Sequence, residues 1–487
     1  MLRTRLIAPY QHVGVRWLAE RETGDHAGGF LCDEMGLGKT VQILAAMCIN
    51  QRQKTLVIAP KSVVSQWRQE IRRFVPTFNV HVYDGPKREL PVFTQEPWVV
   101  VAPYSVLVQR KGKPASPLLG VNWDRVVLDE AHEIRNRASG VHKACVSLKA
   151  RIRWCLSGTP IFNSMKDFVA MGAFLGFTRL EIQGFTDEIR SKYVLRRTKQ
   201  DVCEFNKRLE LPPCDFQNVD LEMHPEEREL YARAFENGRE VVRSVAASSN
   251  QHMYQMQLLE ALLRVRQVMA WPQMYLDGVA KKQETEPETW CGRSRKMDAL
   301  MEMIQTHPKE KALVFCQFIG EMDRIQELLH AAKIPTFRID GGVDKEQREI
   351  RIEAFKAHTY GHQPVFLIQI KSGGVGLNLQ QATRVYITSP AWNPATELQA
   401  IARAHRTGQT QKVTVRKLIY TGEEEGTFGP DGRVRPALPS VEESILGIQE
   451  TKTKVCAEVL NDSRVLAQLP AANAKVTIHA LKKIFRV

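Results

Sequence analysis

Short strand-like runs, one of them (residues 55–60) continuously apolar, are the main pattern in the first third of this chain. They lie at residues 29–32, 55–60, 79–83, 98–102, 125–128 and 152–156. A run that is apolar throughout is typical of a strand buried on both faces of a parallel sheet. Residues 41–47 and 62–74 lie between such runs and have helical patterns, and Ser62 is a candidate cap for the second helix. Strands that alternate with helices predict an α/β domain with a mostly parallel sheet.

Apolar positions change to helical spacing in the middle of the chain. Residues 225–248 and 251–269 carry apolar side chains three and four positions apart, which predicts helices with one buried side. Residues 281–289 place a proline among charges and predict a flexible connection. A second series follows, with strand-like runs at residues 312–316, 336–339 and 365–368 and a predicted helix at residues 318–329.

These changes predict three domains. Residues 1–177 form one α/β domain, residues 178–290 form helical protrusions and a linker, and residues 291–487 form a second α/β domain with a C-terminal helix. A chain of 487 residues is too long for one core and is consistent with two to four domains.

Composition indicates which kind of partner the protein binds and in which cellular compartment it lies. The chain has 43% hydrophobic and 25% charged residues, as soluble globular proteins do. Its net charge of +14 indicates either a polyanionic partner or only a basic, solvated surface. Nine cysteines without a C-x-x-C pair predict a reducing compartment, no disulfides and no structural metal. The most apolar window, residues 98–108, is short and contains Pro103, so we expect an intracellular, soluble protein without membrane contact.

One stretch between a strand and a helix has the sequence of a phosphate-binding loop. Gly36 and Gly38 let the backbone N–H groups approach a polyphosphate, Lys39 reaches the β- and γ-phosphates, and Thr40 holds Mg²⁺. Asp33 stands where the general pattern has glycine, and the alternative is an ordinary turn with a solvated lysine. The predicted ATP-binding residues of this loop are Asp33, Glu34, Met35, Gly36, Leu37, Gly38, Lys39 and Thr40.

Two carboxylates follow the strand-like run at residues 125–128. Asp129 and Glu130 would lie at the carboxyl end of a buried strand, which is where an open α/β sheet binds its ligand. Beside a phosphate loop, Asp129 suits the Mg²⁺ shell and Glu130 suits a base that orients water. The alternative for any Asp-Glu pair is a solvated acidic strand end. The loop next to it favours the catalytic interpretation.

Three further residues are candidates on weaker grounds. Gln11 carries an amide that can donate to and accept from an adenine edge, although such a residue is more often a polar surface residue. Arg403 and Arg406 are three apart and would share one face of a helix. Offered to a γ-phosphate, they would act as arginine fingers; alone, they would be a basic helix end.

The phosphate loop, the Asp-Glu-Ala-His stretch at residues 129–132 and the Ser-Gly-Thr-Pro stretch at residues 157–160 occur in this order. Together with residues 195–199, 371–379 and 399–409, they resemble the Swi/Snf-type branch of the superfamily 2 nucleic-acid ATPases. The resemblance implies two RecA-like parallel-sheet lobes with helical protrusions between them. It assigns coupling of nucleotide state to the DNA track to Ser157, Thr159 and Gln399, and a nucleotide contact to Gly376.

The sequence departs from the family at one point. The family carries an acidic residue shortly before Trp-Asn-Pro, whereas here residues 388–391 are Thr-Ser-Pro-Ala, ahead of Trp392. This puts an inter-lobe or nucleotide-side contact in question without affecting the catalytic set.

The resemblance implies a motor that hydrolyses ATP with Mg²⁺ and translocates on double-stranded DNA. Nucleosomes or other DNA-bound proteins are the expected substrates, with targeting by partner proteins. The alternatives are a strand-separating helicase, a transcription-associated ATPase, or a scaffold with a decayed motor. A nuclear remodeller, a repair translocase and a protein of a large DNA virus at its replication site suit the sequence equally well.

Overall fold

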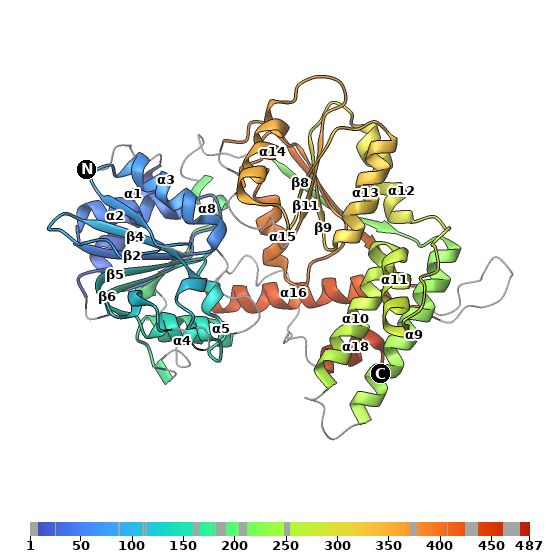
Figure 1. Ribbon diagram of the computed structural model, residues 1–487, viewed down its shortest axis with the longest axis horizontal. Helices are drawn as coiled ribbons and strands as arrows, with labels where there is room; N and C mark the ends of the chain where they lie inside the picture. Colours follow the sequence, from blue (N-terminus) through green and yellow to red (C-terminus); the bar gives the residue numbers. More distant parts are fainter. Residues whose placement is uncertain are drawn as a thin grey trace. The chain divides into compact units, whose positions relative to one another are not determined.

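The chain forms two compact units, seen here in a computed structural model (Figure 1). One unit contains Met1–Glu210 and Lys454–Gln468, and the other contains Leu211–Thr453 and Leu469–Val487. No helix within the described part of the chain is both long and apolar enough to span a membrane. The structure describes residues 8–24, 26–85, 88–109, 112, 114–158, 165–178, 180–181, 191–203, 212–247, 254–370, 377–406, 408–423, 437–460 and 478–487.

The first unit contains a sheet in which all the paired strands are parallel. Its central strands are buried almost throughout, because residues such as Val57, Val100 and Val127 pack on both faces. The predicted α/β class is therefore confirmed for this unit. In spatial order, its strands are β3 (Asn79–Val82), β4 (Trp98–Pro103), β2 (Lys54–Ala59), β5 (Asn122–Asp129), β6 (Lys149–Leu156), β1 (Gly28–Leu31) and β7 (Val194–Leu195).

Helices connect these strands as the apolar pattern predicts. The predicted Ser62 cap is wrong: a short 3₁₀ turn, η1 (Lys61–Val63), comes first, and α3 begins at Val64 without a side-chain cap. The turn after Pro60 takes up the residues that would otherwise form the first turn of the helix. The α-helices described in this unit are α1 (Pro9–Arg21), α2 (Lys39–Ile49), α3 (Val64–Phe74), α4 (Gly140–Val146), α5 (Met165–Phe174) and α8 (Lys199–Cys203).

The second unit repeats the parallel architecture and gains a strand that the sequence did not reveal. Residues Cys214–Leu221, inside the segment expected to be helical, form β8 and pair with β13 at the edge of the sheet. Most of this edge strand is exposed or half-buried, so it lacks the continuous apolar run that marks the central strands. The spatial order is β10 (Thr336–Ile339), β11 (Val365–Gln369), β9 (Ala312–Cys316), β12 (Arg384–Ile387), β13 (Val413–Tyr420) and β8.

Helices pack on both faces of this second sheet. Val314 and Cys316 of β9 face a core shared with the long helices, whereas Leu313 and Phe315 face the opposite core. Helices α9, α10 and α18 pack against one another, and α11 occupies the first part of the expected flexible connection (Figure 1). The helices are α9 (Pro225–Ala247), α10 (Gln255–Ala270), α11 (Pro272–Gln283), α12 (Arg295–Thr306), α13 (Ile319–Ala331), α14 (Lys345–Ala357), α15 (Pro394–Ile401), α16 (Val441–Leu460) and α18 (Ile478–Phe485). Helix α16 belongs to this unit as far as Thr453.

A buried ion pair ties α1 to the first sheet. Arg125 of β5 donates to both carboxylate oxygens of Glu22, at 2.6 and 2.5 Å, and both side chains are almost fully buried. Trp154 and Asn50 also donate to the Glu22 carboxylate. Four donors therefore compensate for the burial of this charge.

Replacing Glu22 with alanine should destabilise the first unit strongly, because Arg125 would remain buried without its counter-charge. We expect the free energy of unfolding to fall by about 3–5 kcal/mol. Denaturant titration followed by tryptophan fluorescence measures this loss. The exposed neighbour Glu20 provides the control, and Glu20→Ala should change stability by less than about 0.5 kcal/mol. Equal stability of Glu22→Ala and Glu20→Ala would show that the network contributes little.

Candidate nucleotide-binding site

The predicted phosphate loop connects β1 to α2. Gly36 (φ 93°) and Gly38 (φ 75°) both have positive φ, a backbone region that residues with a Cβ adopt at a cost. Gly38 is also the N-cap of α2, so the helix starts at Lys39 with Thr40 in its first turn. A loop of this shape ahead of a helix N-terminus is a ready anion site. The expected strand–loop–helix context is present.

Side chains of α1 reach the loop from one side. The Tyr10 hydroxyl donates to the Leu37 carbonyl at 3.0 Å, and the Gln11 amide lies 3.4 Å from the same oxygen. Gln11 is buried and would lie 2.7 Å from a Cβ placed on Gly38. It is thus part of the loop's surroundings and not a surface residue, which leaves its predicted adenine contact a hypothesis.

Two acidic residues of the loop have protein partners. The Asp33 carboxylate is fully buried and accepts hydrogen bonds from Arg197 and from Gln42. Glu34 accepts from the backbone N–H of Lys199 at 2.8 Å. Both carboxylates thus support the loop through contacts with the segment that contains Arg197 and Lys199. Lys39 donates from Nζ to the Asp33 carbonyl at 2.8 Å.

Asp129 is the last residue of β5 and carries a perturbed carboxylate. Trp67 Nε1 donates to its Oδ2 at 2.7 Å, and the Glu130 backbone N–H donates to its Oδ1 at 3.0 Å. Burial, followed by the Glu130 charge, raises the pKa of Asp129 to about 6, and Lys39 opposes this shift. Tyr104 fixes the strand end by donating to the Asp129 carbonyl.

After Asp129, the chain turns at Glu130 into a short 3₁₀ helix, η4 (Ala131–Ile134), whose His132 contacts Ser157 after β6. Glu130 has a left-handed backbone (φ 49°), which is strained for a residue other than glycine and is frequent at functional sites. His132 Nδ1 lies 3.4 Å from both Glu130 Oε2 and Ser157 Oγ. Burial lowers the pKa of His132 to about 4, so the ring is neutral at pH 7 and these contacts are not ion pairs.

The Ser157-Gly158 turn after β6 meets the phosphate loop. A Cβ on Gly158 would lie 2.9 Å from Met35 Cγ and 3.4 Å from Lys39 Nζ. Ser157 is almost fully buried. The first unit thus brings together the loop, the Asp-Glu pair and Ser157 from three strand ends of one sheet, where α/β sheets bind ligands. The predicted coupling residue Thr159 lies outside the described residues.

The oxygen donors at this edge fit a hard divalent cation. Asp129 offers a half-buried carboxylate whose pKa is raised, and a cation would offset that unfavourable charge. The Thr40 hydroxyl is the second predicted ligand. Mg²⁺ is typically held by one or two such protein groups together with water and phosphate oxygens. Both residues therefore fit the expected Mg²⁺, which stays a hypothesis.

In the second unit, the helix that was expected to carry the arginine pair ends too early. Helix α15 stops at Ile401, and Arg403 and Arg406 lie in the following turn. Hydrogen bonds from Arg403 N to Ala400 O and from Ala404 N to Ile401 O tighten the chain into i→i+3 geometry there. The argument that a helix places the two arginines on one face is therefore wrong, although their predicted role is untested.

Residues around α15 hold the arginine-bearing turn in place. The buried Glu397 accepts from the Ala391 N–H, from Lys417 at 3.0 Å and from Gln449 at 2.7 Å. Gln399 is half-buried, and its carbonyl accepts from Arg403 Nε. Gly376, the predicted nucleotide contact of this unit, lies outside the described residues.

The stretch in which the sequence departs from the family, residues 388–391, contributes a buried hydroxyl. Ser389 is buried and accepts from Lys296 Nζ at 2.9 Å. Glu442 of α16 pairs with the same ammonium at 2.5 Å. Lys296 is thus held between the Ser389 hydroxyl and a carboxylate of α16.

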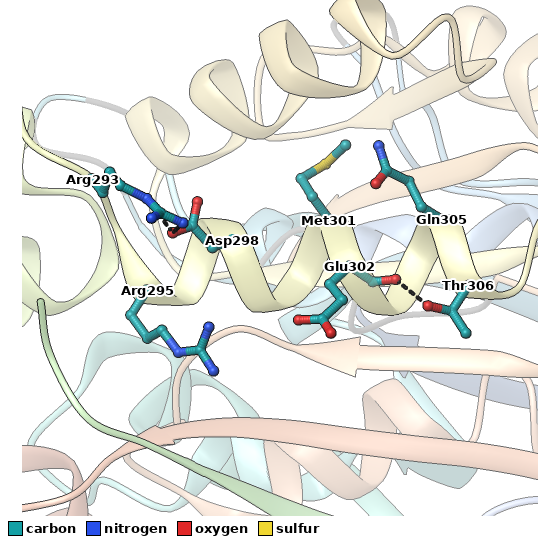
Figure 2. Close-up of a pocket in the computed structure, with 7 residues that line it drawn as sticks. All are labelled: Arg293, Arg295, Asp298, Met301, Glu302, Gln305 and Thr306. Carbon is teal, nitrogen blue, oxygen red and sulfur yellow. Dashed lines mark hydrogen bonds and ion pairs between the residues drawn. The ribbon is translucent and has the colours of Figure 1, made fainter.

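A pocket of about 510 Å³ lies on the surface of α12 (Figure 2). Arg293 points towards Asp298 and pairs with it at 2.8 Å, and Thr306 donates to the Glu302 carbonyl. It contains none of the predicted site residues. Its lining residues are Arg293, Arg295, Asp298, Met301, Glu302, Gln305 and Thr306.

Three contacts of the site were missed in the sequence: Arg197, Trp67 and Tyr10. Arg197 lies in a stretch that carries the family resemblance, but neither Arg197 nor Trp67 has a local pattern that indicates its partner. Arg197 is 164 residues from Asp33, and Trp67 is 62 residues from Asp129. Only the order of the strands in the sheet brings these pairs together.

Comparison with known proteins gives relatives from a virus, a bacterium and a yeast. A protein of Orgyia pseudotsugata multicapsid polyhedrosis virus, named a probable global transactivator, is 30% identical to this chain. The aligned region spans 85% of this chain and 86% of the viral protein. YwqA of Bacillus subtilis, named for an ATP-dependent helicase/translocase activity, is 31% identical over 86% of this chain. The ISWI chromatin-remodeling complex ATPase ISW1 of Saccharomyces cerevisiae is 28% identical over 86% of this chain. The chain spans only 47% and 39% of the last two.

Family models match both units. The SNF2-related domain matches residues 10–185 and 185–274, and the helicase conserved C-terminal domain matches residues 295–408. The first of these matches covers more than half of the chain and contains the phosphate loop, Asp129, Glu130 and Ser157. The chain therefore belongs to the SNF2-related family of helicase-like ATPases.

Proposed function

We propose that the chain is an ATP-driven motor that translocates on double-stranded DNA and thereby remodels DNA–protein complexes. The observation that carries the proposal is the convergence of Lys39, Asp129, Glu130 and Ser157 at one edge of the first sheet. Gly158 is close enough to Lys39 that an added Cβ would lie 3.4 Å from its ammonium. A scaffold with a decayed motor would have no reason to keep this set together.

Each of these side chains has a separate task in hydrolysis. The N–H groups of the loop and the Lys39 ammonium bind the β- and γ-phosphates of ATP. Glu130 orients the attacking water and accepts its proton, and His132 holds a position between Glu130 and Ser157. Arg403 and Arg406 stabilise the charge that develops on the transferred phosphoryl group.

In this proposal, Thr40 and Asp129 would bind the Mg²⁺ ion that accompanies ATP. When bound, Mg²⁺ neutralises charge on the β- and γ-phosphate oxygens. Trp67 orients the Asp129 carboxylate through its indole N–H, and Tyr104 fixes the backbone carbonyl of the same residue.

The track is double-stranded DNA, bound mainly through phosphates. The net charge of +14 and the family membership support a polyanionic track. Binding of this kind is strongly salt-dependent and reads little sequence. Nucleosomes, as the name of the yeast relative suggests, are one candidate obstacle on that track.

ATPase rates measured side by side test the proposal. The rate is compared without nucleic acid, with single-stranded DNA, with duplex DNA and with nucleosomes. Stimulation by duplex DNA or nucleosomes supports the proposal. Stimulation only by single strands would favour a strand-separating helicase, and the absence of hydrolysis would favour a scaffold.

Loss of the loop lysine and loss of the water-orienting carboxylate should have different effects. Lys39→Ala should remove turnover, because the β- and γ-phosphates lose the ammonium that the loop offers them. Glu130→Gln should bind ATP normally and lose hydrolysis, because only the base is gone. Equilibrium nucleotide binding and steady-state ATPase separate the two. The exposed neighbour Glu133 is the matched control, and Glu133→Gln should remain active. Normal hydrolysis by folded Glu130→Gln would refute the assignment.

The arginines should affect chemistry more than DNA binding. Arg403→Ala or Arg406→Ala should lower kcat by about 10³-fold, as for other arginine fingers. The affinity for duplex DNA should change little, since these side chains are proposed to contact the nucleotide and not the DNA. The opposite result, weak DNA binding with normal ATPase, would make them contacts to the DNA backbone.

Translocation should proceed without strand separation. Unpairing costs about 1.4 kcal/mol per base-pair step on average, and an unwinding motor needs a structure that holds the strands apart. Tracking needs only successive phosphate contacts. A triplex-forming strand placed ahead of the motor should therefore be displaced with ATP, while a forked duplex in the same buffer stays paired. Efficient unwinding of the fork would establish the helicase alternative.

A further inference from the structure

We propose that Arg197 is a positioning residue for nucleotide binding: it holds the phosphate loop and the Tyr10–Gln11 segment in one arrangement. The inference rests on the proposed ATPase function and adds a residue that touches no substrate. It depends on contacts made within the first unit.

The Arg197 guanidinium joins three elements that are far apart in sequence. Its Nε donates to Asp33 Oδ1 at 3.0 Å, and its Nη2 donates to Asp33 Oδ2 and, at 2.7 Å, to Gln42 Oε1. Its Nη1 donates to the Tyr10 carbonyl, and its Cζ lies 5.1 Å from the Tyr10 ring centroid. One planar group thus contacts the loop, α2 and α1. An arginine fork suits this task because it donates in several fixed directions.

The contact acts on the first residue of the loop. Asp33 is fully buried, and a carboxylate in that position is costly unless it is paired. Its carbonyl also accepts from Lys39, so a shift of Asp33 would move the phosphate-binding lysine. Gln42 completes the clamp, because its Nε2 donates to Asp33 Oδ2 at 3.0 Å and to the Leu37 carbonyl at 3.2 Å.

The backbone fixes Arg197 relative to the loop. Cys32 N donates to the Leu195 carbonyl at 2.7 Å, and Glu34 N donates to the Arg197 carbonyl at 2.8 Å. These bonds continue the parallel pairing of β1 with β7 beyond the end of both strands. The loop therefore begins beside a rigid neighbour, and the Arg197 side chain has little freedom to relax away from Asp33.

A glycine in α1 shows how closely the helix approaches this clamp. A Cβ on Gly14 would lie 2.0 Å from Gln42 Oε1 and 2.6 Å from Arg197 Nη2. Glycine is a poor helix former, and its φ here is ordinary, so the close approach is the physical reason for its presence. Gly14 lets α1 rest directly on the Arg197–Gln42 pair. That contact sets where Tyr10 and Gln11 meet Leu37.

The test measures ADP affinity with a fluorescent ADP, together with KM and kcat for ATP in the presence of duplex DNA. Arg197→Met should weaken ADP binding by roughly 10- to 100-fold, the range expected when a binding group is displaced by about 1 Å. Arg197→Lys keeps the charge without the fork and should recover only part of the loss. KM for ATP should rise more than kcat falls, unlike the Arg403→Ala variant, in which kcat falls.

Gly14→Ala tests the same clamp with Arg197 present. The added methyl group should displace Gln42 and Arg197 and weaken ADP binding in the same direction. Gly447→Ala is its control, because Gly447 lies in α16 and nothing stands within 4 Å of an added Cβ. ADP binding by Gly447→Ala should match the unmodified protein.

A second matched control separates positioning from stability. The double variant Asp33→Asn/Arg197→Met removes one buried ion pair of the first unit, and Glu22→Gln/Arg125→Met removes another. Both should lower the thermal midpoint, but only the first should weaken ADP binding by more than about twofold. Unchanged ADP binding in folded Arg197→Lys and Gly14→Ala would overturn the proposal. Failure of the unmodified protein to bind ADP or hydrolyse ATP would instead refute the proposed function.

Discussion

Two carboxylates at one edge of a parallel sheet, the buried Asp33 and the half-buried Asp129, are the constraint on which the candidate site depends. Asp33 follows β1 and Asp129 ends β5, and each needs a compensating partner. Asp33 is neutralised by the Arg197 guanidinium. The hydrogen bonds described for Asp129 come from the neutral Trp67 and Glu130 N–H groups, and its pKa is raised to about 6. One carboxylate therefore supports the loop, and the other fits a bound cation.

The same edge explains why distant segments contribute to one site. Strands β1, β5, β6 and β7 share a sheet, so the segments after them lie together even though Asp33 and Arg197 are 164 residues apart. Ser157 follows β6 and approaches both His132 and the loop. In the second unit, Glu397 and Glu442 are likewise buried and paired with lysines, which holds α15 and α16 against their sheet.

The family resemblance and the physical analysis support each other at different points. The motifs identified an SNF2-related chain, and the family models confirm that membership. The catalytic set that the motifs name stays a prediction. The structure adds the reason why the set is held in place: Glu130 in a left-handed turn, His132 kept neutral by burial, and Gly14 admitting α1 to the Arg197–Gln42 pair. Of these residues, only Glu130 has a chemical task in the proposed reaction, and His132 and Gly14 act through their neighbours.

The sequence by itself determined the α/β class, the phosphate loop and the positions of most strands, because continuous apolar runs and a glycine-rich loop before a helix are local patterns. It did not determine β8, since an edge strand that is mostly exposed or half-buried has no such run. It also placed Arg403 and Arg406 on a helix that ends at Ile401, because the i→i+3 bonds that tighten that turn leave no mark in residue spacing. Only the tertiary structure decided that Arg197 pairs with Asp33 and Glu442 with Lys296. Both are long-range contacts, set by strand order and by the cost of leaving a buried charge unpaired.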